Sequence, residues 1–181
     1  TPPFEGGYLG SNPGPAANMY LFLVAPGLCL IYFFLYWLFP IFFKGSIPAL
    51  NRRSWYSLGF IIAIFTLVFA ASWAIDDSEL SNRILHIFGG GFLSFLICFL
   101  AVKDTKLQIG KFQFFIFSFL VVVSLGAANE MLEYFLQNYL NFSFAKTAND
   151  TWLDLISNSI GALIASVILV PFIKRNNQNK I

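Results

Sequence analysis

The chain has few charged side chains, and this scarcity decides its class. Only 11% of its 181 residues are Asp, Glu, Lys or Arg, whereas 57% are hydrophobic. A soluble domain usually has about one quarter charged residues. These proportions exclude an ordinary soluble protein and predict an integral membrane protein.

Histidine and cysteine are also scarce, with one His and two Cys. The single histidine, His86, excludes haem held by two histidines. Cys29 and Cys98 fall in different apolar segments, so we expect them to pack as small side chains and not to form a disulfide. The sequence has no nucleotide, nucleic-acid or nucleophile motif, and we predict no nucleic-acid partner.

Long apolar runs predict an all-α membrane bundle of about five transmembrane helices. The runs are too long for the strands of a barrel, about ten residues each, and each reaches the roughly twenty residues that a bilayer requires. The predicted spans are residues 18–43, 55–75, 84–102, 112–139 and 151–173. Pro26, Gly27 and Pro40 predict a kink in the first span.

These spans form a predicted transmembrane domain over residues 18–175. It is preceded by an irregular extracytoplasmic arm, residues 1–17, in which Pro and Gly are frequent. A polar cytoplasmic tail, residues 176–181, follows it.

Basic side chains predict how the bundle is oriented. Nine of the eleven lie on alternate connections or in the tail: Lys44, Arg52, Arg53, Lys103, Lys106, Lys111, Lys174, Arg175 and Lys180. Positively charged connections usually stay in the cytoplasm. We therefore predict that the amino terminus is outside and the carboxyl terminus is inside.

Three polar spots interrupt the apolar segments. They are His86, the pair Glu130 and Glu133, and the set Asp150, Asp154 and Asn158. Ionisable groups are costly in a bilayer, so each spot is a candidate functional site. In the predicted topology, His86 and Asp154 lie about one turn below the outer interface, and Glu130 lies roughly 27 Å along its helix. All three spots should therefore form one pocket near the outer surface.

Residue spacing places these groups on common helix faces. Gly126, Glu130, Glu133 and Gln137 are three or four residues apart, as are Asp150, Asp154, Asn158 and Gly161. Residues with these spacings share one face of a helix. The glycines on these faces, together with Gly89, Gly90 and Gly91 beside His86, predict that the helices pack closely.

The chemistry of this pocket has several interpretations. His86, Glu130, Glu133 and Asp154 are the ligand types of a divalent metal ion. The pocket could instead hold a lipid headgroup or small polar ligand. Glu130 and Glu133 could share a proton, which would suit a proton relay or an acid and base pair. A purely structural set of hydrogen bonds between helices is a further interpretation, and the spacing favours none of them.

Three sequence runs resemble the VanZ-like family of small bacterial membrane proteins. They are Ile84-Leu-His-Ile-Phe-Gly89, Asn129-Glu-Met-Leu-Glu-Tyr134 and Asp150-Thr-Trp-Leu-Asp-Leu-Ile-Ser-Asn-Ser-Ile-Gly161. The matching positions are His86, Glu130, Asp154, Asn158 and Gly161. Glu133 and the Asp150-x-Trp152 element are more similar to YjdF-type membrane proteins. Ser81-Asn82-Arg83 stands where the VanZ-like pattern has Asp-Lys before the histidine.

The resemblance implies a multi-pass protein of the bacterial inner membrane, linked to glycopeptide resistance, in particular to teicoplanin. It also implies that the outer pocket binds or processes a polar ligand, a lipid or a cell-wall intermediate. Two other function classes stay open. One is an accessory subunit of a larger membrane complex, with a structural role or, less favoured, pigment binding. The other is a transporter or proton-relay element.

Overall fold

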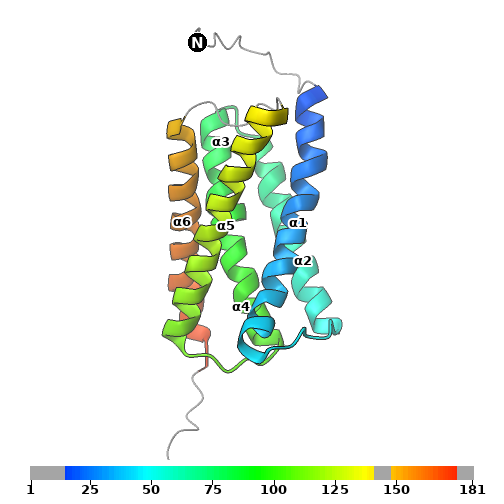
Figure 1. The fold of residues 1–181 in the computed structure, drawn as a ribbon, viewed down its shortest axis with the longest axis vertical. Helices are drawn as coiled ribbons and strands as arrows, with labels where there is room; N and C mark the ends of the chain where they lie inside the picture. Colours follow the sequence, from blue (N-terminus) through cyan, green and yellow to red (C-terminus); the bar gives the residue numbers. More distant parts are fainter. Residues whose placement is uncertain (1–14, 141–147, 175–181) are drawn as a thin grey trace, which may run out of the picture.

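The computed structural model describes residues 15–140 and 148–174, and within them the chain is helical and has no strand. The elements are α1 (Pro15–Lys44), α2 (Arg52–Trp73), α3 (Ser78–Ile84), η1 (Leu85–Leu93), α4 (Ser94–Asp104), α5 (Lys111–Leu140), α6 (Ala148–Leu169) and η2 (Val170–Phe172). They form the antiparallel bundle of Figure 1. The predicted all-α bundle is confirmed.

Within residues 15–140 and 148–174, four helical segments are long and apolar enough to cross a membrane. They are Arg52–Ser72, Ser78–Asp104, Lys111–Tyr139 and Asn149–Phe172. Within α1, Cys29–Lys44 is a shorter apolar helix. α1 is one helix across Pro26, Gly27 and Pro40. α1 includes residues 15–17, which were predicted to belong to the irregular arm. The other residues of the predicted arm and the predicted tail, residues 176–181, lie outside the described ranges.

The third span begins six residues before its predicted start, at Ser78 instead of Ile84. Asp77 explains this earlier start, because its side chain accepts hydrogen bonds from the backbone amides of Glu79, at 2.9 Å, and Leu80, at 3.1 Å. Such an N-cap satisfies amides that otherwise lack partners at a helix start. Residues 78–83 therefore belong to the span, although the apolar pattern alone predicts that they form a connection.

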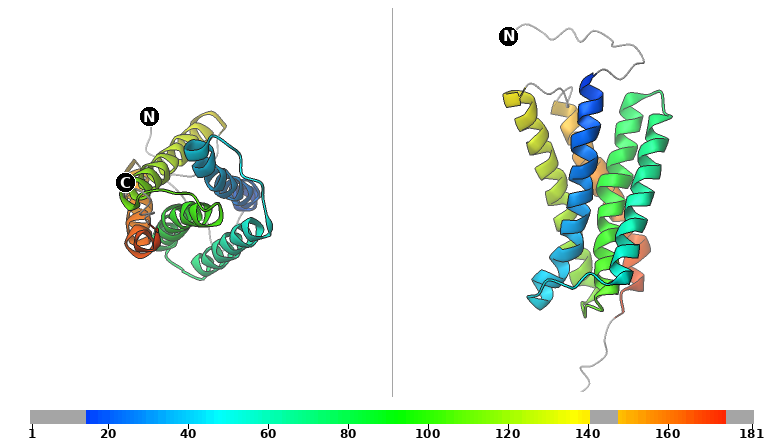
Figure 2. Two further views of the ribbon diagram at one scale, coloured as in Figure 1. Left: turned by 90° about the horizontal axis from the view of Figure 1, so that it is seen from below. Right: turned by 90° about the vertical axis from the view of Figure 1, so that its right-hand side faces the viewer.

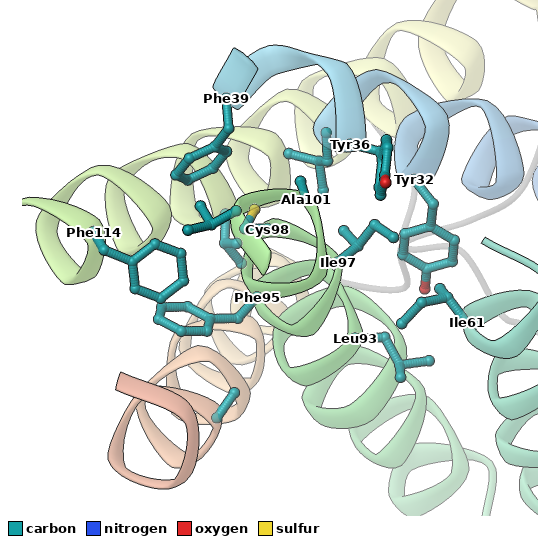
Figure 3. Close-up of a cluster of buried hydrophobic side chains, with 14 of the residues drawn as sticks. Tyr32, Tyr36, Phe39, Ile61, Leu93, Phe95, Ile97, Cys98, Ala101 and Phe114 are labelled. Atoms are coloured by element: carbon teal, nitrogen blue, oxygen red, sulfur yellow. The ribbon is translucent and has the colours of Figure 1, made fainter. Parts of the chain in front are cut away.

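This third span, α3–η1–α4, lies at the centre of the bundle. Seen along the bundle axis in Figure 2, α4 is surrounded by α1, α2, α5 and α6, and it contacts all four. Its side chains pack with those of the other helices in the apolar core shown in Figure 3, where Phe95 and Cys98 lie near Phe39 of α1 and Phe114 of α5. Cys29 and Cys98 are both free cysteines.

The end of the bundle with the α1–α2 and α4–α5 connections also holds a polar contact. Asp104, whose side chain is only 2% exposed, pairs with Arg53 at 2.8 Å. It also accepts hydrogen bonds from Tyr36, at 3.0 Å, and Ser57, at 2.6 Å. One carboxylate therefore joins α1, α2 and α4. Which side of the membrane this end faces stays a prediction.

Candidate functional site

His86 and the glycine run lie on a π-helix. In η1 the backbone follows the wider π pattern over nine residues, between the α-helical segments α3 and α4. Such segments are rare and frequently occur at functional sites. Tyr32 of α1 donates a buried hydrogen bond of 2.9 Å to the carbonyl of Gly89. The π-helix is thus held by a specific contact from a neighbouring helix.

The glycines let η1 and α6 touch through their backbones. A Cβ atom at Gly161 would lie 1.9 Å from the carbonyl oxygen of Ile87. A Cβ atom at Gly91 would lie 2.3 Å from the carbonyl oxygen of Asn158. Real Cβ contacts under 3.0 Å are essentially never seen, so no other residue fits these positions without a backbone shift.

Asn158 lies in a narrow space between η1 and α5. A Cβ atom at Gly90 would be 1.9 Å from its Oδ1, and one at Gly126 would be 2.9 Å from its Nδ2. The Asn158 residue is 3% exposed, and its Oδ1 is buried without a hydrogen-bond partner among the described residues. Gly89 serves a different contact, because its Cβ would lie 3.3 Å from the Phe65 ring.

Arg83 is a member of the polar cluster, although the sequence pattern predicts that it lies in an outer connection. Its guanidinium pairs with Asp150 at 2.5 Å and also with Asp154, both on α6. Asn82 adds a hydrogen bond of 3.0 Å to Asp154 Oδ1. The two aspartates are therefore joined through one cation from α3. The signal that would have found Arg83 is its spacing, three residues before His86 on the same helix.

His86, Glu130 and Asp154 come together from η1, α5 and α6. One potential ligand atom from each lies within 4.8 Å of the other two. His86 Nε2 is 3.4 Å from Asp154 Oδ1. Glu130 is 6% exposed, and both of its carboxylate oxygens are buried without a hydrogen-bond partner in the described part of the chain.

Glu133 is outside this set of three and faces a cavity instead. Its Oε1 accepts a hydrogen bond of 2.7 Å from Asn129. The cavity has a volume of about 100 Å³, which is enough for several water molecules or one small polar group. Its polar lining is Asn82, His86, Ser94, Asn129, Glu133 and Asn158, and its apolar lining includes Ile31, Phe65, Phe69, Leu85 and Leu125.

The cluster contains more acid than base. Four carboxylates, from Glu130, Glu133, Asp150 and Asp154, accompany one guanidinium. With all four ionised and a neutral imidazole, the formal charge is −3. Desolvated charge of one sign is costly unless it is compensated. The arrangement therefore favours protons, a metal cation or a cationic ligand.

A family model described as Predicted membrane protein (DUF2238) matches residues 34–175. The chain belongs to this family. The match includes every residue of the acidic cluster. No curated protein and no solved structure matches the chain. Family membership and the apolar helices together identify a multi-pass membrane protein.

Proposed function

We propose that this chain is a VanZ-like membrane protein whose pocket binds the headgroup of a polar lipid or lipid-linked cell-wall intermediate. The observation that carries the proposal is the cavity of mixed lining beside the acidic cluster. Its acceptors, Glu133 and the unpartnered Oδ1 of Asn158, suit a ligand that brings N–H donors. The aromatic and aliphatic lining suits an attached chain.

An ammonium group is the headgroup chemistry that fits best. The cluster has three more carboxylates than guanidinium groups, so it favours positive charge over phosphate or carboxylate. An ammonium could come from a lipid, as in phosphatidylethanolamine, or from a free amine. In the predicted orientation the pocket lies near the outer leaflet, where cell-wall intermediates are handled.

Lipid binding to the purified full chain tests this proposal. We expect native mass spectrometry to detect retained phosphatidylethanolamine in preference to phosphatidylglycerol. Glu133→Gln keeps the shape of the side chain and removes its charge, so it should weaken retention by about tenfold, or about 1.4 kcal/mol. Glu79→Gln, at an exposed position, is the matched control and should change nothing.

Free ethanolamine separates the two sources of the ammonium group. Stabilisation by ethanolamine with no lipid preference would point to a small solute in the same pocket. If neither compound binds, or if Glu133→Gln and Glu79→Gln behave alike, the proposal is rejected. The link to resistance has its own measurement, because expression in a susceptible bacterial host should raise the teicoplanin concentration that inhibits growth, and Glu133→Gln should abolish the effect.

A further inference from the structure

We infer that His86, Glu130 and Asp154 bind one divalent metal ion, of the zinc or manganese class. This set of three adjoins the cavity of the proposed function and shares only His86 with its lining, and the inference does not depend on the ligand proposed there. One imidazole nitrogen with two carboxylate oxygens is a donor set that suits zinc and also first-row metals such as manganese.

The geometry is close to that of a bound ion. Two donors that each lie about 2.1 Å from a metal are roughly 3.4 Å apart in a tetrahedral site and at most about 4.2 Å apart. The three donor atoms here lie within 4.8 Å of one another, and His86 Nε2 and Asp154 Oδ1 are already 3.4 Å apart. Side-chain adjustments of less than about 1 Å would complete coordination.

Glu130 is a separate observation that indicates a ligand. It comes from a different helix than the aspartates, is 94% buried, and presents two oxygens without partners at the cluster. A buried carboxylate usually has hydrogen bonds, a proton or a metal as compensation. In contrast, the buried Asp104 at the other end of the bundle has protein partners from two helices.

A divalent ion would also compensate most of the excess negative charge. Arg83 pairs with both aspartates, and a divalent cation would reduce the formal charge of the cluster from −3 to −1. The contacts of Arg83 and Asn82 fall on Oδ1 of Asp154 and orient its carboxyl group. Outer hydrogen bonds of this kind commonly fix the ligands of a metal site.

Metal titration of the purified full chain, extracted without chelator, tests the inference. We expect about one Zn²⁺ or Mn²⁺ per chain by inductively coupled plasma mass spectrometry and by calorimetry. Co²⁺ as a substitute should give visible absorption bands. Glu130→Gln should lower the affinity by more than about tenfold. Asp104→Asn, which changes a buried carboxylate at the far end, is the matched control and should bind as the wild type does.

A second variant keeps the test decisive if Glu130→Gln does not fold. His86→Gln changes a side chain that is 15% exposed and removes the nitrogen donor. The inference is overturned if folded wild-type protein binds neither metal stoichiometrically, or if both variants retain wild-type affinity. Lipid retention measured with and without EDTA distinguishes the two proposals, because loss of metal binding alone leaves the headgroup proposal standing.

Discussion

Gly161→Ala should destabilise the bundle through a backbone collision between α6 and η1. The new Cβ would lie 1.9 Å from the carbonyl oxygen of Ile87 and 2.9 Å from the amide nitrogen of Phe92. Ordinary contact begins at 3.4 Å, so the two backbones would have to separate by about 1.5 Å. Overpacking typically costs about 1–3 kcal/mol, and here no flexible side chain can move aside.

Helix propensity acts in the opposite direction and must be measured separately. Alanine is favoured over glycine by about 1 kcal/mol inside a helix. Gly59→Ala in α2 isolates this gain, because nothing lies within 4 Å of the new Cβ there. We therefore expect Gly59→Ala to be neutral or stabilising, and Gly161→Ala to be about 1–3 kcal/mol less stable than Gly59→Ala.

Thermal or denaturant unfolding of both variants in the same detergent is the assay. A separation of the two backbones would also move His86 away from Asp154, so metal affinity should fall in Gly161→Ala and stay unchanged in Gly59→Ala. Equal stability of the two variants would show that η1 and α6 are not in backbone contact, and would refute this packing.

Three further substitutions test other contacts by unfolding in the same detergent. Arg83→Gln removes the ion pairs with Asp150 and with the buried Asp154, so it should cost about 3 kcal/mol; a loss below about 0.5 kcal/mol would contradict the pairing with Asp154. Tyr32→Phe removes the hydrogen bond to Gly89 and should cost about 0.5–1.5 kcal/mol, whereas Tyr56→Phe, at an exposed position, should cost less. Asp104→Asn loses the charge that pairs with Arg53 and should cost about 1 kcal/mol; an unchanged unfolding midpoint would argue against this contact.

The all-α fold could be predicted from the sequence because its signals are local. Apolar runs of bilayer length and basic residues in alternate connections are both recognised from consecutive residues, without knowledge of contacts between distant segments. The common level of the polar groups follows from counting residues along each helix. The structure accordingly places His86, Glu130 and Asp154 together, although they come from separate helices.

The features that the sequence does not predict depend on contacts between distant segments. The ion pair of Arg83 with Asp154 joins residues 71 positions apart. The spacing of Arg83 from His86 places the two on one face, but it does not identify Asp154 as the partner. A span that starts at Ile84 leaves Arg83 in a connection, because hydropathy alone does not reveal the Asp77 cap. Glu130 belongs to the set of three, whereas Glu133 lines the cavity. These two positions depend on how α5 is rotated against its neighbours.

The π-helix η1 also sets the rotation of α4 relative to α3, which is the angular phase of the central span. Its wider turns rotate the chain less per residue than an α-helix does, so α4 is offset in angle from α3 about their shared axis. One span can thereby direct Arg83 toward α6 near one end and Phe95 toward the aromatic core near the other. Removal of a single residue from 85–93 would reset that phase and misalign the charged and the apolar faces together, a defect that no single side-chain replacement reproduces.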